Sequence, residues 1–275
     1  MTTIAITGAA SGIGKATAER LIGSGHRVIS VDMRDADVVA DLRIASARRG
    51  AADAIIAACD GVLDGAVTCA GLGGIPSRAG SQLIDVNYFG TVDLLTALRP
   101  SLAAAPAASV VALGSNSTTI SPRIPMNVVD ACLAGDRDRA AARADQVGAV
   151  ATYPATKVGV SRWVRRLAPT PEWIGAGIRM NVVAPGMIET ALIAEQRRDE
   201  EMRPLLELLP IPVGRPGRPE EIASLIEFLV GPDSTFFCGS IVLADGGSEA
   251  LLRPDDWPMP WGIDLGETAP TPRGD

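Results

Sequence analysis

Short apolar runs alternate with stretches of helical periodicity along most of this chain. Apolar runs of strand length predict strands at 3–7, 27–32, 38–42, 65–69, 109–113, 177–184 and 240–245. Helical spacing of apolar positions predicts helices at about 12–23, 43–58, 83–103, 150–168 and 219–230. Apolar strands that alternate with helices are typical of a parallel sheet covered on both faces. We therefore predict a single-domain α/β fold, with a doubly wound parallel sheet of about seven strands and helices on both faces.

Two stretches do not fit this alternation. Residues 116–149 are polar, contain proline and are only partly helical in pattern, so we interpret them as an insertion into a domain that spans 1–250. Residues 251–275 are rich in proline, contain Trp257 and Trp261, and predict an extended C-terminal tail.

Composition narrows the class of protein. Hydrophobic residues make up 47% of the 275 positions, which excludes general disorder. The formal net charge of −7 argues against nucleic acid or an anionic membrane surface as the main partner. No apolar run approaches the roughly 20 residues of a membrane-spanning helix. The chain begins directly on a strand pattern without a basic leader, so we expect a cytoplasmic protein.

Cysteine and histidine usage excludes two further kinds of site. The cysteines are scattered, with no CxxC spacing and no histidine cluster, so we expect neither a metal site nor a disulfide framework. His26 is the only histidine and lies between a Gly-Ser-Gly turn and a strand. A Ser-His-Asp hydrolase would need His26 as its base, and we interpret it instead as a surface-turn residue.

A glycine-rich turn, TGAASGIG at 7–14, joins the first predicted strand to the first predicted helix. Gly8, Gly12 and Gly14 would let the backbone approach a pyrophosphate, and the helix N-terminus would offer unpaired N–H groups to it. Glycines alone are equally typical of a plain strand–helix turn. Asp32, however, follows Gly14 by 18 residues at the end of the second strand, where an acid can bind ribose hydroxyls. Together these features predict dinucleotide binding.

Asp32 also bears on the choice between NAD and NADP. A carboxylate at this place would repel a 2′-phosphate, and Ser11 offers no compensating positive charge. We therefore predict NAD, while Arg34 is a nearby cation that keeps NADP open.

Tyr153 and Lys157 lie four residues apart and so share one helix face. A solvated surface pair is the simplest interpretation. The chemical interpretation is a proton-transfer pair, because a cation about 4 Å from a phenol contributes on the order of 4 kcal/mol at an effective dielectric of about 20. That energy would lower the pKa of Tyr153 from about 10 by roughly three units before burial opposes it.

The turn TGxxxGIG followed by YxxxK resembles the short-chain dehydrogenase/reductase family, over residues 2 to about 250. Further segments resemble its motifs: Asp41–Leu42, TCAG at 68–71 with both asparagines of the family's NNAG replaced, Asn87 in VNYFG, Ser115 in ALGSNS, and Asn181 to Thr190 around Pro185–Gly186. The resemblance implies a Rossmann-type, NAD-binding domain. It also implies an NAD-dependent oxidoreductase that acts on alcohols or ketones.

The same resemblance implies roles for individual residues. Tyr153 would be the general acid/base, Lys157 would lower its pKa and bind the nicotinamide ribose, and Ser115 would bind the substrate oxygen. Asn87 would support a water-linked proton relay to Lys157. Two alternatives stay open: Ser117 lies two residues from Ser115 and could take its role, and Asn87 also fits a helix-kink residue that bonds to backbone. The implied cofactor-binding residues are Gly8, Ser11, Gly12, Ile13, Gly14, Asp32, Met33, Asp41, Leu42, Cys69, Ala70, Gly71, Tyr153, Lys157, Pro185, Gly186, Ile188 and Thr190.

The insertion is a further point of resemblance. Ser115 and Tyr153 are 38 residues apart, far more than in most members of the family. A similar insertion marks the bacterial 3α-hydroxysteroid dehydrogenase/carbonyl reductases, which this chain also resembles in VDMRDADVVADL, DVNYFG and the closing DGG. The flanking helices form the family's usual subunit contact, so the resemblance implies a homo-oligomer, with an unusual dimer favoured over the common tetramer.

The segment after Gly186 bears on the substrate. Its apolar positions between 187 and 209 suit a hydrophobic alcohol or ketone, such as a 3-hydroxysteroid, although the same stripe could equally pack on the body of the protein or on a partner subunit. An epimerase or dehydratase on the same scaffold is the alternative enzyme. A non-catalytic dinucleotide sensor is a third hypothesis, which the complete Asn-Ser-Tyr-Lys set disfavours.

Overall fold

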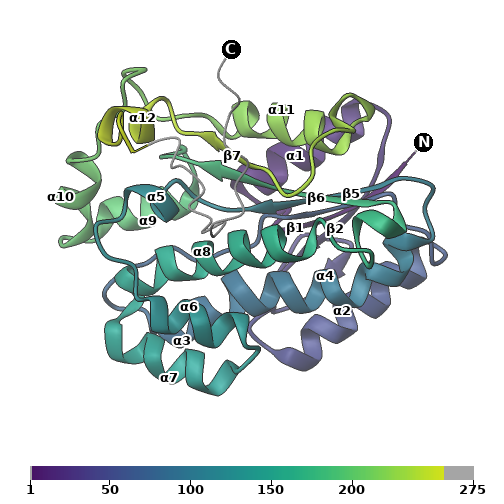
Figure 1. Ribbon diagram of the computed structural model, residues 1–275, viewed down its shortest axis with the longest axis horizontal. Coiled ribbons are helices and arrows are strands. Elements are labelled where there is room, and N and C mark those ends of the chain that lie inside the picture. Colours follow the sequence, from purple (N-terminus) through teal and green to yellow (C-terminus); the bar gives the residue numbers. More distant parts are fainter. Residues whose placement is uncertain (1, 257–275) are drawn as a thin grey trace, which may run out of the picture.

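The protein folds around a seven-stranded sheet whose neighbouring strands are all parallel, in the order β3-β2-β1-β4-β5-β6-β7 (Figure 1). The computed structural model describes residues 2–256. Its strands are β1 (Thr3–Thr7), β2 (Arg27–Asp32), β3 (Val38–Val39), β4 (Gly65–Thr68), β5 (Ala108–Leu113), β6 (Ile178–Pro185) and β7 (Ile241–Ala244). The prediction of a doubly wound parallel sheet is therefore confirmed.

Helices cover both faces of the sheet. On one face lie α1 (Gly12–Gly23) and α11 (Pro219–Val230), which enclose an apolar cluster around Ile6 and Val111. The other face carries α2 (Ala45–Ala58), α4 (Gly90–Ala103) and α8 (Ala149–Leu167) over a larger cluster. Strands buried on both faces explain why the sequence shows continuous apolar runs rather than alternation.

The parallel register brings the carboxyl ends of the central strands to one edge. Thr7 of β1 pairs with Thr68 of β4, which in turn pairs with Ala112 of β5, and Leu113 pairs with Val183 of β6. Ligands of open α/β sheets bind at this carboxyl edge. At the same end of the molecule lie α5 (Ser117–Ile120), α9 (Ala191–Arg198), α10 (Met202–Glu207) and α12 (Ser248–Leu252).

The segment predicted as one helix at 83–103 is divided into three elements. The α-helical turn α3 (Gly80–Leu83) leads into the π-helical turn η1 (Ile84–Phe89), and α4 follows. The N–H of Gly90 reaches back five residues to the carbonyl of Asp85, which is the hydrogen bond of a π-helix. The prediction of a uniform helix is thus wrong over 84–89, near its start, because side-chain periodicity cannot distinguish one widened turn from an α-helical one.

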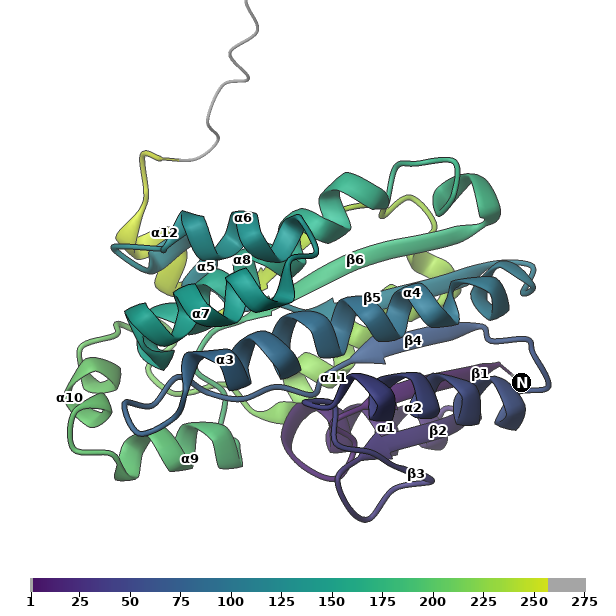
Figure 2. The same cartoon turned by 90° about the horizontal axis from the view of Figure 1, so that it is seen from below.

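The insertion forms two further helices, α6 (Met126–Leu133) and α7 (Arg137–Val147), outside the layer of α4 and α8. Figure 2 shows both helices on that side of the molecule, beside α8 and α3. The insertion therefore covers η1 and α8, which belong to the two segments on which the family's usual subunit contact was expected.

The remaining described elements are short: η2 (Ile174–Ala176) and η3 (Pro232–Ser234) are 3-10 turns. The helix α12 continues past residue 250, where the tail was predicted to begin. Trp257 and Trp261 lie outside the described residues. Within residues 2–256, no helix combines the length and apolarity needed to cross a membrane.

Candidate active site

The glycine-rich turn packs directly on the loop that follows β4. Gly8 has a φ of +69°, and a Cβ at this position would lie 2.7 Å from the backbone nitrogen of Ala70. A Cβ on Gly14 would lie 2.1 Å from the carbonyl oxygen of Gly8. Neither position can carry a side chain without moving backbone, so the turn stays narrow enough for close approach by a ligand.

Asp32 ends β2 beside this turn. Its carboxylate accepts hydrogen bonds from the backbone N–H of Ala10 (3.0 Å) and of Met33 (2.7 Å). These bonds tie the turn to β2 and hold the carboxylate at the wall of a cleft of about 430 Å³. The placement is what a ribose-binding acid requires.

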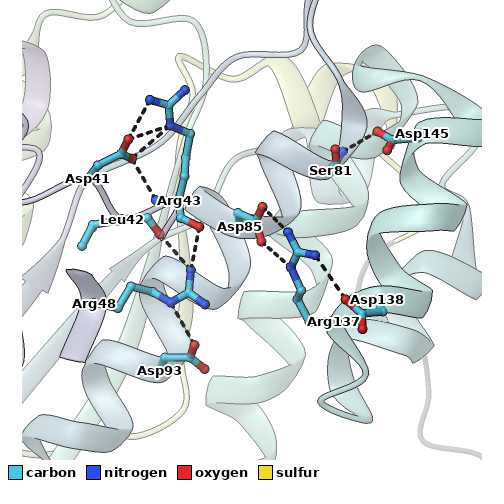
Figure 3. A network of polar contacts seen from close by, with 10 residues as sticks. All are labelled: Asp41, Leu42, Arg43, Arg48, Ser81, Asp85, Asp93, Arg137, Asp138 and Asp145. Atoms are coloured by element: carbon cyan, nitrogen blue, oxygen red, sulfur yellow. Dashed lines mark hydrogen bonds and ion pairs between the residues drawn. The ribbon is translucent and has the colours of Figure 1, made fainter. Parts of the chain in front are cut away.

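The far end of this cleft is formed by the segment after β3. Asp41 and Leu42 line it, and Asp41 pairs with Arg43 at 2.6 Å, which lowers the pKa of the Asp41 carboxyl by hydrogen bonding (Figure 3). The buried guanidinium of Arg48, on α2, donates to the carbonyls of Leu42 (2.9 Å) and Arg43 (3.3 Å). It also pairs with Asp93 on α4 at 2.9 Å. Arg48 thus holds the cleft-lining segment from behind.

Sequence reasoning missed Arg48, because the sequence of α2 does not distinguish it from the neighbouring Arg49, and only the structure shows that Arg48 is buried. Arg34 does not line the cleft, whereas Arg43 does, and the charge of Arg43 is already paired with Asp41.

A smaller pocket of about 90 Å³ continues from the cleft at the carboxyl ends of β4, β5 and β6. Every residue predicted for the site, apart from Asn87, lines the cleft, the pocket or both. Those predicted residues in the small pocket are Ile13, Cys69, Gly71, Ser115, Tyr153, Lys157, Pro185, Gly186, Ile188 and Thr190. The structure therefore brings together residues from five separate segments of the chain.

Tyr153 and Lys157 lie on the first half of α8 and face this pocket. Lys157 Nζ donates to the carbonyl of Leu113 at 2.8 Å and lies 5.9 Å from the centre of the Tyr153 ring. Burial lowers the pKa of Lys157 to about 8. Burial also raises the pKa of Tyr153, and a polar contact with Ser115 only partly opposes it. The net direction for Tyr153 is opposite to the one predicted, because desolvation outweighs the hydrogen bond with Ser115.

Ser115, rather than Ser117, belongs to the pocket. Ser115 is buried, lines the pocket beside Tyr153, and its Oγ accepts a hydrogen bond from the Ser117 N–H at 3.1 Å. The Ser117 hydroxyl is buried with no hydrogen-bond partner among residues 2–256 and does not line the pocket. The turn after β5 therefore directs Ser115 toward the tyrosine.

Asn87 lies behind the pocket on η1, almost fully buried. Its Oδ1 accepts from the Leu72 N–H at 2.7 Å, and its Nδ2 donates to the Leu72 carbonyl (3.0 Å) and to Thr156 Oγ1 (3.3 Å). A Cβ on Gly71 would lie 3.4 Å from Asn87 Oδ1 and 3.8 Å from Lys157 Nζ. Asn87 therefore bonds to backbone, as the alternative interpretation held, and does so next to the lysine.

The helix α9 forms one wall of the pocket. Thr190 caps it by accepting a hydrogen bond from the Ile193 N–H, and Leu192 lines the pocket. The buried Gln196 donates to the Gly74 carbonyl at 3.0 Å. The neighbouring Glu195 pairs with Arg78 of the 71–78 loop at 2.8 Å. The segment that the sequence assigned to the substrate side thus packs on this loop, and its two polar contacts had no signal in the sequence.

Known proteins resemble this chain over most of its length. Two family models match in succession: "short chain dehydrogenase" over residues 2–126 and "enoyl-(acyl carrier protein) reductase" over 140–249. The unmatched residues 127–139 fall within the insertion. A 3-alpha-hydroxysteroid dehydrogenase/carbonyl reductase of Comamonas testosteroni is 35% identical, with 92% of this chain and 99% of the relative covered. A cyclohexanol dehydrogenase of an Acinetobacter species is 31% identical, with coverages of 88% and 92%.

Among solved structures, the 3-alpha-hydroxysteroid dehydrogenase from Pseudomonas sp. B-0831, complexed with NADH, superposes with a TM-score of 0.87. It is 40% identical, and the match covers 92% of this chain and 99% of that one. The sheet order and the glycine turn define a Rossmann-like α/β protein. Within that class, the chain belongs to the short-chain dehydrogenase/reductase family and is an oxidoreductase.

Proposed function

We propose that this protein transfers hydride between NAD(H) and a hydrophobic secondary alcohol or ketone, of the 3-hydroxysteroid or a related carbonyl class. The observation that carries the proposal is the meeting of Tyr153, Lys157 and Ser115 around one small pocket that opens into the larger cleft. This is where a reacting carbon would lie within reach of both a proton donor and a dinucleotide.

The cleft fits a nicotinamide dinucleotide by its own geometry. Gly8 and Gly14 keep the turn free of side chains at the N-terminus of α1, where backbone N–H groups favour a pyrophosphate. Asp32 would bind the ribose and disfavour a 2′-phosphate, and the neighbouring Arg43 is neutralised by Asp41. These features support NAD over NADP. The cofactor, when bound, would accept or supply the hydride.

The residues of the pocket would handle the proton. The raised pKa of Tyr153 keeps its phenol protonated near neutral pH, so it can donate to a carbonyl oxygen that becomes an alkoxide. The Ser115 hydroxyl, in polar contact with that phenol, would donate a hydrogen bond to the same oxygen. Lys157, held by the Leu113 carbonyl, supplies positive charge beside the tyrosine. Asn87 fixes the Leu72 backbone behind them.

The lining of the small pocket supports an apolar substrate. Besides the proton-handling groups, its walls include Leu72, Leu113, Ile188, Leu192 and Ile193. Such a wall favours a ring or chain that brings few hydrogen-bonding groups of its own. The names of the hydroxysteroid and cyclohexanol dehydrogenases among the relatives agree with that class.

We also propose that the protein is a homo-oligomer. The helices α6 and α7 cover α3, η1 and α8, so a subunit contact would have to use another surface. Analytical ultracentrifugation of the full chain tests this, and a monomer at assay concentrations would contradict it.

The function is tested with a panel of alcohols and both cofactors. We expect NADH formation from a 3α-hydroxysteroid and from cyclohexanol, little from galactitol, and lower efficiency with NADP. The matched variant is Tyr153→Phe, which should lower kcat by about 100-fold or more while leaving NADH binding unchanged. Conversion of the substrate with no net NADH would point to an epimerase or dehydratase. NADH binding without turnover of any alcohol or ketone would contradict the proposal.

A further inference from the structure

A buried acid on η1 is bound by the insertion. Asp85 lies in the sequence IDVNYF, where every residue is buried, and only 11% of its side chain is exposed. Arg137, the first residue of α7, binds it in a bidentate manner, with Nε to Oδ1 at 2.9 Å and Nη2 to Oδ2 at 2.8 Å (Figure 3). The pairing raises the pKa of Arg137 through the hydrogen bonds to Asp85. Bidentate arginine–carboxylate pairs fix orientation as well as distance.

The helix α7 also contacts the start of α3, which directly precedes η1. Asp145 Oδ1 accepts a hydrogen bond from the Ser81 N–H at 2.7 Å, at the start of α3. A Cβ on Gly80 would lie 2.2 Å from the carbonyl oxygen of Ala144, so the two backbones are in direct contact. The insertion therefore contacts this segment at the start of α3 and again near the start of η1.

The opposite side of η1 carries Asn87. Asp85 and Asn87 are two residues apart, and at about 100° per residue they face roughly opposite directions on a helix. The structure shows this directly, because Asp85 reaches Arg137 whereas Asn87 reaches Leu72 and Thr156. A single π-helical turn is less regular than the α-helix around it, so its side-chain directions depend on tertiary contacts.

We propose that the insertion is a positioning element for the active site. Arg137, acting through Asp85, fixes η1 so that Asn87 holds the Leu72 backbone next to Lys157. Arg137 and Asp85 are positioning residues, since neither lines the pocket or the cleft. The kinetic consequence rests on the proposed function, whereas the ordering of the Leu72 amide does not.

The test compares Arg137→Met with Arg139→Met. Arg139 lies on the same helix, and its ion pair with Asp136 at 3.3 Å is about half exposed and does not touch η1. Hydrogen exchange of the cofactor-free protein reports on the Leu72 N–H, which donates its hydrogen bond to Asn87 Oδ1. We expect this amide to exchange about tenfold faster in Arg137→Met and at the wild-type rate in Arg139→Met.

Kinetics of the holoenzyme give the second measurement. We expect Arg137→Met to lower kcat by about tenfold through misplacement of the site, with the Kd of NADH unchanged. Asp85→Asn should lower kcat to a similar extent. The double variant should have the same kcat as either single variant, because both substitutions remove the same contact between Arg137 and Asp85. Arg137→Lys, which keeps the charge without the bidentate geometry, should be intermediate and also provides the measurement if Arg137→Met does not fold.

Two results would overturn the inference. If Arg137→Met, or Arg137→Lys in its place, is less stable but keeps the wild-type Leu72 exchange rate and kcat, the ion pair serves stability alone. Equal effects of Arg139→Met would show that any charge lost from α7 acts in the same way. If the wild-type protein turns over no alcohol or ketone, the proposed function fails, and the exchange measurement still decides the positioning role.

Discussion

Replacing Arg48 by methionine tests whether the segment that lines the far end of the cleft is held from behind. Arg48 is buried on α2 and donates to the carbonyls of Leu42 and Arg43, and it pairs with Asp93. Methionine keeps most of the aliphatic volume of the side chain and removes all three interactions. The sheet should stay folded, because the three partners of Arg48 lie outside the strands.

The magnitude follows from burial. The Leu42 carbonyl loses a buried partner, which costs about 1–3 kcal/mol of unfolding free energy. The pair with Asp93, whose side chain is 44% exposed, contributes about 0–1 kcal/mol. We therefore expect Arg48→Met to lower the free energy of unfolding by about 1–4 kcal/mol. Cofactor binding must then order the segment again, at about 1–2 kcal/mol per residue, so the Kd of NADH should rise about tenfold.

Urea denaturation measures the first effect and NADH fluorescence titration the second. The matched control is Arg99→Met on α4, whose side chain only reaches the Glu172 carbonyl at 3.3 Å on the surface. We expect the control to bind NADH as the wild type does. A destabilised Arg48→Met that binds NADH with unchanged Kd would refute the reasoning, because it would show that Arg48 supports the core without shaping the cleft.

Four further predictions follow from single contacts. Gly14→Ala should raise the Kd of NADH by about 100-fold or more in a fluorescence titration, since its Cβ would meet the Gly8 carbonyl at 2.1 Å. Asp32→Ser should raise the ratio of kcat/KM for NADP over NAD by about tenfold, by removing the charge that repels a 2′-phosphate. Ser115→Ala should lower kcat by about 100-fold, whereas Ser117→Ala should keep the wild-type kcat. A large loss in Ser117→Ala with an active Ser115→Ala would assign the role to Ser117 instead. The wild-type free energy of unfolding should rise by about 1 kcal/mol from pH 8 to 9, relative to the change measured for Lys157→Met by urea denaturation. The reason is that Lys157 has a pKa of about 8 in the folded protein and 10.5 in the unfolded chain, so between these values the unfolded chain binds more protons.

Much of the fold could be read from the sequence because buried parallel strands and amphipathic helices leave strong local patterns. The glycine turn and Asp32 were also predictable, since their spacing along the chain is set by one strand–helix–strand unit. The contacts of Arg48 with Asp93 and of Arg137 with Asp85 were not, because they join residues 45 and 52 positions apart with no local signal. The direction of the Tyr153 pKa escaped prediction for a related reason, as burial depends on the whole packing around the pocket.

Burial shifts the pKa values of Tyr153 and Lys157 in opposite directions, and these shifts set the protonation state of the pocket. Removing water disfavours the charged form of each group, so the pKa of Tyr153 rises while that of Lys157 falls to about 8. Near neutral pH the phenol therefore holds its proton and the lysine remains mostly charged. In the proposed reaction this state would serve as a general acid beside a cation, which is the form that carbonyl reduction needs, whereas alcohol oxidation needs a phenolate. Lys157 Nζ donates to the Leu113 carbonyl rather than to the Tyr153 hydroxyl. The phenol oxygen therefore carries no hydrogen bond from the lysine that would favour loss of its proton, which supports proton donation as the resting role of Tyr153.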